Sequence, residues 1–145
     1  MENKKYKPLF DKLYWCISVP TTLFVLITTV VLGILSPETL FWMIPLSLLI
    51  IYFFISPFFG YVELRETSLF IRYGLLLKKE IPYEKIKGMV KERKFYAESM
   101  MSLKNALEHV NIKYNAFDVT TVSVVDNDEM MREIQKRLSS DEKGV

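Results

Sequence analysis

Lysine and arginine side chains are concentrated in one part of this sequence, and they are its best candidates for binding a ligand. Seven lie close together: Lys78, Lys79, Lys85, Lys87, Lys91, Arg93 and Lys94. Residues 60–94 carry nine basic and five acidic side chains, whereas residues 95–145 carry six basic and nine acidic ones. Cations beside a membrane attract anionic lipid headgroups by about 1 kcal/mol each. The cluster predicts contact with anionic lipid or a partner protein; ordinary surface charge near a membrane is the alternative.

Residue patterns typical of catalysis or metal binding are missing from the sequence. His109 is the single histidine and Cys16 the single cysteine, so neither a His/Cys metal set nor a disulfide can form within the chain. His109 lies in an alternating strand pattern, which favours a structural role. We therefore expect no catalytic, cofactor or metal site and a protein that is not an enzyme. The net charge of +2 also argues against nucleic acid as a partner.

Two uncharged runs, residues 13–35 and 40–59, precede the basic cluster. A helix rises about 1.5 Å per residue, so about 20 residues cross the hydrocarbon core of a bilayer. Ser36, Pro37, Glu38 and Thr39 separate the runs, and Glu38 is the one charge between positions 13 and 59. The first run is longer than the core of a signal peptide, and a second follows at once. We expect a retained transmembrane helical hairpin.

The charges that flank the hairpin predict its orientation. Lys4, Lys5, Lys7 and Lys12 precede the first run, nine basic residues follow the second within positions 60–94, and the turn between the runs has no lysine or arginine. Basic residues favour the cytoplasmic side. We expect a cell-membrane protein with two spans and with both termini in the cytoplasm. Neither run contains Asp, Glu, Lys, Arg or His, which argues against a transporter.

Small residues in the first run are spaced for close helix packing. Ser18 and Thr22, and likewise Thr29 and Gly33, lie four positions apart on one helix face. Small side chains let helix backbones approach closely in lipid. The partner is either the second helix or another copy of the chain, so the oligomeric state stays open.

The chain beyond the hairpin has room for one small domain. Its alternating and β-branched patterns predict strands at 61–65, 69–73, 75–81, 85–91, 107–114 and 119–125. Asp126 and Glu129 predict the start of a helix, in which Met130, Ile134 and Leu138 form an apolar stripe. The predicted fold is α+β: an N-terminal transmembrane hairpin, then a small antiparallel β-domain closed by a C-terminal helix.

These elements divide the chain into four expected parts. Residues 1–12 form a cytoplasmic N-terminal segment, 13–59 the transmembrane hairpin, 60–138 the β-domain with its helix, and 139–145 a tail.

The order of segments within residues 61–138 resembles a bacterial pleckstrin-homology-like (PH-like) domain family. The resemblance rests on residues 69–76, residues 79–86, Ser102-Leu103 and residues 112–114. It looks like the branch that includes the membrane-anchored immunity protein against the bacteriocin sublancin. The family often has Ser-Pro after the isoleucine of the last strand, whereas this chain has Val122-Ser123-Val124-Val125. The resemblance implies a PH-like fold, and fold does not determine function.

Two functions of different classes follow. The first is bacteriocin immunity, in which a non-enzymatic membrane protein intercepts a peptide toxin or shields its target. The second is a membrane-tethered adaptor or regulatory module that binds a partner protein or anionic lipid through exposed edge strands and residues 95–106.

Overall fold

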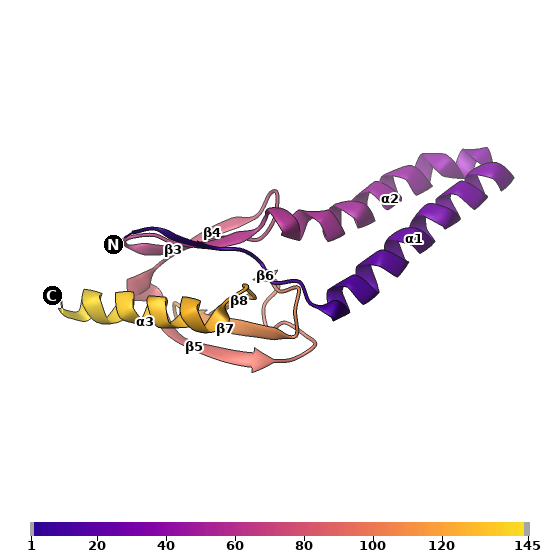
Figure 1. The fold of residues 1–145 in the computed structure, drawn as a ribbon. Helices are drawn as coiled ribbons and strands as arrows, with labels where there is room; N and C mark the ends of the chain where they lie inside the picture. Colours follow the sequence, from indigo (N-terminus) through magenta and orange to yellow (C-terminus); the bar gives the residue numbers. More distant parts are fainter. Residues whose placement is uncertain (1, 144–145) are drawn as a thin grey trace.

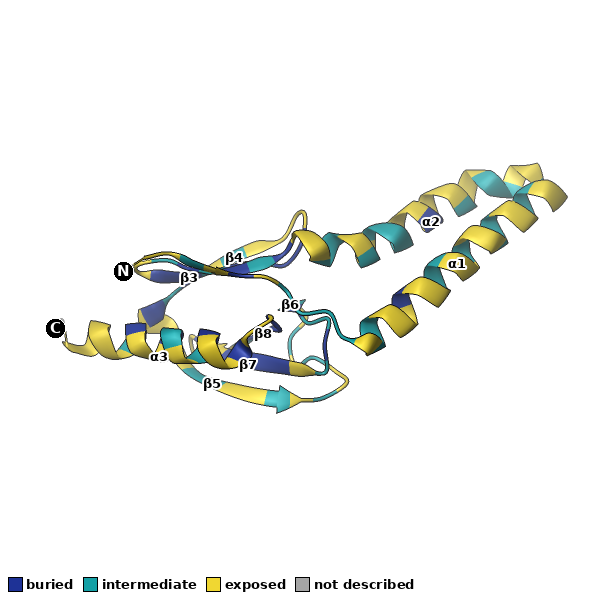
Figure 2. Ribbon diagram, in the orientation of Figure 1, coloured by how far each residue is buried: buried dark blue, intermediate teal, exposed yellow. Residues whose placement is uncertain are grey.

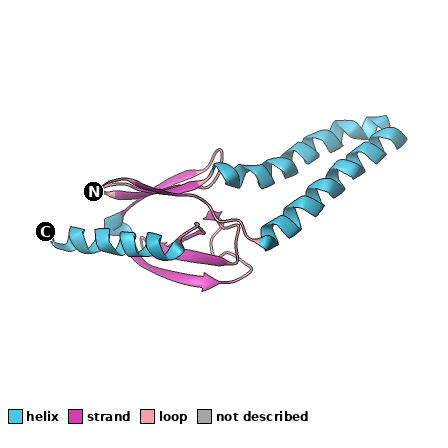
Figure 3. Cartoon of the chain, in the orientation of Figure 1, coloured by secondary structure: helices cyan, strands magenta, loops and turns pink. Residues whose placement is uncertain are grey.

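A helical hairpin projects from a domain of two β-sheets and one helix in the computed structural model, which describes residues 2–143 (Figures 1 and 3). The hairpin does not simply precede the domain in the chain. It begins in the domain, leaves it for the hairpin and then returns, so both legs of the hairpin start from the same end of the domain (Figure 1).

The hairpin consists of α1 (Lys12–Leu35), the 3-10 turn η1 (Pro37–Thr39), α2 (Leu40–Ile55) and the 3-10 turn η2 (Ser56–Phe59). Among the described residues, two helical segments are long and apolar enough to cross a membrane: Lys12–Leu35 and Pro37–Phe59. Most of their apolar side chains are exposed, which is unfavourable in water and expected in lipid (Figure 2).

The small-residue face of α1 packs against α2. The hydroxyls of Thr29 and Ser47 lie 2.7 Å apart, and each also bonds a carbonyl one turn earlier in its own helix. A Cβ added to Gly33 would lie 2.6 Å from Leu40 Cδ2, so the missing side chain allows a close approach there. The sequence leaves two partners open for this face, the second helix or another copy of the chain. In the structure, the second helix contacts Thr29 and Gly33.

The first sheet has the strand order β1-β2-β3-β4, and all its pairs are antiparallel. Its strands are β1 (Lys4–Tyr6), β2 (Tyr61–Leu64), β3 (Ser68–Arg72) and β4 (Lys78–Pro82). The N-terminal segment, expected to be separate from the β-domain, therefore supplies a strand to it. Lys4 pairs with Leu64 and Tyr6 with Val62. Three residues are too few for a recognisable strand pattern, which is why the sequence does not predict β1.

The second sheet has the order β5-β7-β8-β6. Its strands are β5 (Ile86–Arg93), β6 (Ser102–Leu103), β7 (Glu108–Tyr114) and β8 (Asp118–Val122). β6 is only two residues long and pairs with β8 in parallel, so no sequence pattern distinguishes it from the irregular residues that follow β5. Asn115 adopts a positive φ of 52° in the β7–β8 turn, a conformation that asparagine tolerates better than most residues.

The N-terminal segment also joins the two sheets. After β1, Pro8 bridges to Val124 and Phe10 bridges to Asn105, while the Leu9 amide donates to the Ser123 carbonyl at 3.0 Å. One continuous stretch thus pairs first with β2 in one sheet and then with residues around β8 in the other. The domain is closed along this side by residues that precede the hairpin.

The helix α3 (Asn127–Lys143) lies along the opening between the sheets (Figure 1). Asp126 caps it as expected, since its Oδ1 accepts a hydrogen bond from the Glu129 amide at 2.9 Å. Met130 and Ile134 are fully buried in the core. The helix continues to Lys143, so residues 139–143, expected to be a tail, are helical; residues 144–145 lie outside the described part of the chain.

Two predicted strands are shorter than expected: β8 ends at Val122 instead of residue 125, and the strand expected at residues 75–81 begins three residues late. Residues 75–77 form a turn, in which the Tyr73 amide donates to the Leu77 carbonyl at 2.9 Å, and β4 begins only at Lys78. Three consecutive leucines suggest a buried strand, yet all three side chains are exposed.

Candidate functional site

The seven basic residues predicted to bind a partner lie along two strands at the borders of the sheets. Lys78 and Lys79 begin β4, Lys85 ends the 3-10 turn η3 (Tyr83–Lys85), Lys87, Lys91 and Arg93 lie in β5, and Lys94 follows β5. β4 is the last strand of the first sheet, and β5 is an outer strand of the second. The cluster therefore follows two edge strands and the short turn between them.

Two members of the cluster are held by acidic side chains. Lys91 Nζ lies 2.8 Å from Asp128 in α3 and 3.6 Å from Glu108 in β7. Lys94 Nζ lies 2.8 Å from Glu92 and 3.2 Å from Glu98. These hydrogen bonds raise the pKa of both lysines and lower the pKa of Asp128 and Glu92. Lys91 and Lys94 thus stabilise local structure, and their charges are already balanced.

Lys79 has an aromatic partner instead of an acidic one. Its ammonium group donates to the Tyr114 hydroxyl and lies 4.7 Å from the centre of that ring. Tyr114 is in β7 of the second sheet, so Lys79 links the two sheets. A cation over an aromatic ring is a favourable contact, so Lys79 helps to hold the two sheets together.

Four members remain available for a partner: Lys78, Lys85, Lys87 and Arg93 are exposed and contact no acidic side chain within residues 2–143. They do not form one patch. Lys78 pairs with Arg72 at the hairpin end of the first sheet. The Lys85 carbonyl accepts a bond from the Asn115 amide at the far end. Lys87 and Arg93 are six positions apart, about 20 Å along an extended strand.

β5 offers its backbone along the border of the second sheet. It is eight residues long, pairs with β7 on one side and ends the sheet on the other. Such an edge carries unpaired N–H and C=O groups that can pair with another extended chain. The Val90 side chain, 44% exposed, lies midway along it. Lys87 and Arg93 flank Val90 and would oppose pairing with a second basic edge.

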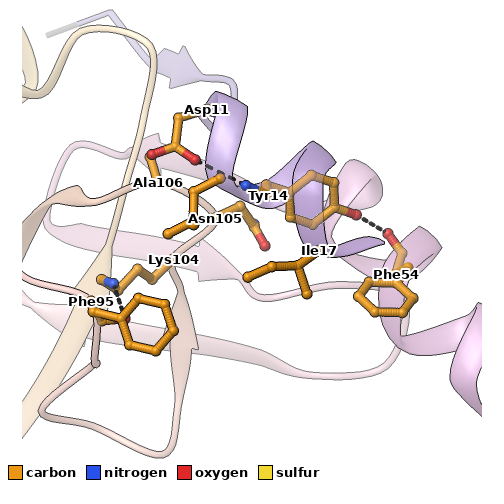
Figure 4. A pocket seen from close by; sticks show the side chains of 9 residues that line it. Asp11, Tyr14, Ile17, Phe54, Phe95, Lys104, Asn105 and Ala106 are labelled. Carbon is orange, nitrogen blue, oxygen red and sulfur yellow. Dashed lines mark hydrogen bonds between the residues drawn. The ribbon is translucent and has the colours of Figure 1, made fainter. Parts of the chain in front are cut away.

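A pocket that no sequence pattern predicts lies at the junction of the domain and the hairpin. It has a volume of about 170 Å³ and lies between the start of α1, the end of α2 and the segment after β5. Figure 4 shows Ile17 of α1 and Phe54 of α2 facing Phe95 and Lys104 of the domain. The pocket is largely apolar, as is suitable for a site close to lipid.

Hydrogen bonds fix the polar groups around this pocket. Asp11 caps α1 through Oδ1, which accepts from the Tyr14 amide at 3.1 Å, and its Oδ2 accepts from the Leu107 amide at 2.8 Å. The Tyr14 hydroxyl donates to the Phe54 carbonyl and so ties α1 to α2. Lys104 Nζ donates to the Phe95 carbonyl at 2.9 Å (Figure 4), and burial lowers the pKa of Lys104 despite the nearby Asp11.

Part of this junction could have been found from the sequence. An aspartate directly before an apolar helix is a recognised cap, and Asp11 occupies that position. Its second contact, with Leu107, joins residues far apart in the chain and has no sequence pattern. Asp11 therefore couples α1 to the domain in a way that only the fold reveals.

His109 is fully buried, and its Nδ1 lies 2.9 Å from the Leu107 carbonyl. Its position in β7 agrees with the structural role expected from the strand pattern. Within residues 2–143, no group of three or more His, Cys, Asp or Glu side chains is arranged to hold a metal ion.

The comparisons with known proteins give one result. A family model described as a bacterial PH domain matches residues 60–138, more than half of the chain. A search of curated proteins and a search of solved structures each found no match. The family expected from the order of segments is confirmed, and so is the expected fold of two apolar helices, antiparallel sheets and a C-terminal helix. The match does not distinguish the immunity-protein branch.

Proposed function

Since the chain belongs to the bacterial PH domain family, we propose that it is a non-enzymatic membrane protein whose PH-like domain binds a protein partner at the cytoplasmic face of the membrane. In this proposal, the domain is an adaptor that the hairpin anchors. Lys87, Arg93 and the backbone edge of β5 supply its contacts.

The observation that carries this proposal is the double attachment of the hairpin. α1 follows the segment that joins the two sheets, and η2 leads into β2 through Gly60. The rings of Phe10 and Phe58 stack with their centres 4.3 Å apart, so the two connections lie together. A domain held at two adjacent points keeps a fixed orientation, with its strands running away from the hairpin (Figure 1).

The edge of β5 defines the chemistry of the partner. An extended segment would gain backbone hydrogen bonds along eight residues, as in other cases of strand addition. Acidic residues in that segment would face Lys87 and Arg93, whereas a basic one would be repelled. We therefore propose an acidic, extended protein segment as the partner.

Cross-linking from defined positions tests this proposal in cells that express the full chain. A photoreactive amino acid at Val90 should form a discrete adduct with one partner, because Val90 lies at the middle of the edge. The control position is Phe117, which is 96% exposed in the β7–β8 turn. Lys87→Gln with Arg93→Gln should weaken the Val90 adduct. Equal labelling from both positions would contradict an edge-specific partner.

The cytoplasmic orientation is tested separately. A reporter fused after Val145 should be active only when it stays in the cytoplasm, because basic residues flank both ends of the hairpin. Activity at the same position of a second reporter, one that works only outside the cytoplasm, would reverse the orientation, and the partner would then have to be an exported protein.

Bacteriocin immunity is the second candidate, and the order of segments that resembles the immunity-protein branch favours it. In that role the partner is the peptide toxin or its membrane target. Expression in sensitive cells should raise survival against one toxin of a panel. A chain with Lys87→Gln and Arg93→Gln should protect less well if the same edge is used. Unchanged sensitivity across the panel would contradict immunity and leave the adaptor role as the remaining proposal.

A further inference from the structure

We infer that two loops of the PH-like domain enter the membrane interface beside the hairpin, so that the domain rests on the lipid surface. The first is the exposed tip of the β3–β4 turn, residues 75–77. The second is the segment just after β5, residues 95–100. This contact is with lipid, whereas the partner proposed for the β5 edge is a protein; Arg93, the last residue of β5, borders both surfaces.

The β3–β4 turn is attached to the end of the second membrane-spanning segment. The Leu75 amide donates to Ser56 Oγ at 3.1 Å, and Ser56 begins η2. A Cβ added to Gly74 would collide with the same Ser56 Oγ, so the turn is packed directly on the span. Lipid that surrounds the span at Ser56 must therefore also meet this turn.

The turn presents apolar side chains outward in a fixed conformation. Leu76 is 78% exposed and Leu77 is 60% exposed. The Arg72 guanidinium donates to the Gly74 carbonyl at 2.9 Å and to the Leu75 carbonyl at 3.3 Å, which holds the turn in shape. Exposed leucines of this kind mark a contact surface, because water is an unfavourable environment for them.

The second loop lies against the other side of the hairpin base. Phe95 lines the junction pocket together with Ile17 of α1 and Phe54 of α2. Its side chain is 71% exposed, and those of Tyr96 and Met100 are 61% and 104% exposed. Aromatic side chains are favoured at the boundary between lipid and water, where a tyrosine hydroxyl can stay hydrated.

Basic residues next to both loops suit the phosphate layer. Lys78 directly follows the leucines, and Arg93 lies just before the second loop. Their long side chains can reach phosphate groups while neighbouring apolar groups enter the interface. The two loops flank the base of the hairpin from the two sheets, so one flat membrane surface can meet both (Figure 2). Lys85 and Lys87, at the far end of the domain, take no part.

Fluorescence quenching by lipid tests the inference with the full-length chain in nanodiscs of phosphatidylcholine and phosphatidylglycerol. Cys16→Ala removes the native thiol, and single cysteines replace Leu76, Tyr96 or, as a control, Phe117. Each cysteine carries an environment-sensitive probe. Phe117 is more exposed than either test residue and lies in the β7–β8 turn, at the far end of the domain.

Probes at positions 76 and 96 should emit at shorter wavelength than the probe at 117. They should also lose most of their fluorescence when the lipids carry a nitroxide near the headgroup. Emission that matches position 117 at either test position would overturn the two-loop contact. A shift that vanishes when each nanodisc holds one chain would also overturn it, because the contact would then be with a second copy.

Discussion

Single residues decide which charges of this protein are free to act. Lys91 and Lys94 form ion pairs with acidic neighbours, and Lys79 contacts an aromatic ring, although all three belong to the same basic run as Lys87. Charge in the sequence therefore overstates the charge offered to a partner. Two other residues, Tyr73 and Arg137, are buried polar groups, and we expect the stability of the domain to depend on them.

Tyr73 makes the stability of the domain sensitive to alkaline pH. Thr120 donates to the Met101 carbonyl at 3.1 Å, so the Tyr73 hydroxyl, 2.5 Å from Thr120 Oγ1, must donate to Thr120. Burial raises the pKa of Tyr73 to about 12 from the ordinary value of 10.0. The unfolded chain loses this proton first. Ionisation of Tyr73 therefore costs no stability below pH 10. As the pH rises from 10 to 12, the free energy of unfolding should fall by about 2–3 kcal/mol.

The measurement is chemical unfolding of the purified protein in detergent as a function of pH. Tyr73→Phe should be less stable at neutral pH by about 1 kcal/mol, because one hydrogen bond is lost. Its stability should also fall less steeply between pH 10 and 12 than that of the natural chain. Parallel profiles for the two proteins would show that Tyr73 does not carry the effect.

Arg137 should be the most important charged residue for folding. It is 3% exposed and donates to the carbonyls of Arg65 and Glu2, which joins α3 to the residues just before β1 and to the β2–β3 turn. Arg137→Met keeps the apolar stem and leaves both carbonyls without this donor, so we expect a loss of about 2–4 kcal/mol in unfolding free energy.

Arg132→Met is the matched control for Arg137, because Arg132 is exposed on the same helix. Its effect should stay within about 0.5 kcal/mol. Equal losses for the two variants in the same denaturant titration would contradict the role given to Arg137.

At the scale of elements, the passage from η2 to β2 limits how the hairpin leaves the domain. Gly60 has an ordinary backbone conformation, with φ −75° and ψ 156°. A Cβ there would lie 2.8 Å from the Arg72 carbonyl oxygen and 3.1 Å from that of Pro57. Backbone atoms on both sides cannot move away cheaply. The glycine is needed for space and not for flexibility.

Gly60→Ala should therefore destabilise the protein by about 1–3 kcal/mol. Gly88→Ala is the control, because a Cβ at Gly88 meets nothing within 4 Å. That second change should leave stability unchanged or raise it by up to about 1 kcal/mol, since alanine restricts the unfolded chain. Thermal unfolding of both variants, followed by near-ultraviolet circular dichroism, compares them. A Gly60→Ala midpoint equal to that of Gly88→Ala would refute the steric argument.

At the scale of the whole molecule, the helical hairpin is an insertion between two parts of one domain. β1 and the segment up to Phe10 pair with both sheets before the chain enters α1. The matched family region, residues 60–138, does not contain these strand residues. A soluble fragment cut at residue 60 would leave β2 with an uncovered edge and an exposed part of the core.

Two soluble fragments test this organisation. A chain of residues 60–145 should aggregate or stay unfolded, because it lacks β1. Residues 2–11 joined to residues 60–145 by a short glycine-serine linker should fold, since Phe10 and Phe58 stack at 4.3 Å and the gap to be bridged is small. Dispersed amide resonances from the fragment without β1 would show that this strand is dispensable.

The sequence by itself determined the elements whose physics is local. Twenty or more apolar residues must form a helix that can cross a membrane, because a lipid environment leaves no other way to satisfy the backbone. Alternation predicted the long strands, and Asp126 predicted the start of α3. The order of these segments was sufficient to identify the family.

Only the tertiary structure decided the contacts between distant segments. Three residues of β1 and two of β6 carry no periodic signal, and they are strands only because a long neighbour supplies their partners. The leucines after Gly74, expected in a strand, are an exposed turn, because Arg72 and Ser56 hold them there. The seven basic residues lie within 17 positions of the sequence, from 78 to 94. In an extended strand, however, each further residue lies about 3.3 Å along the chain. The residues predicted to form one cluster therefore lie at opposite ends of the domain.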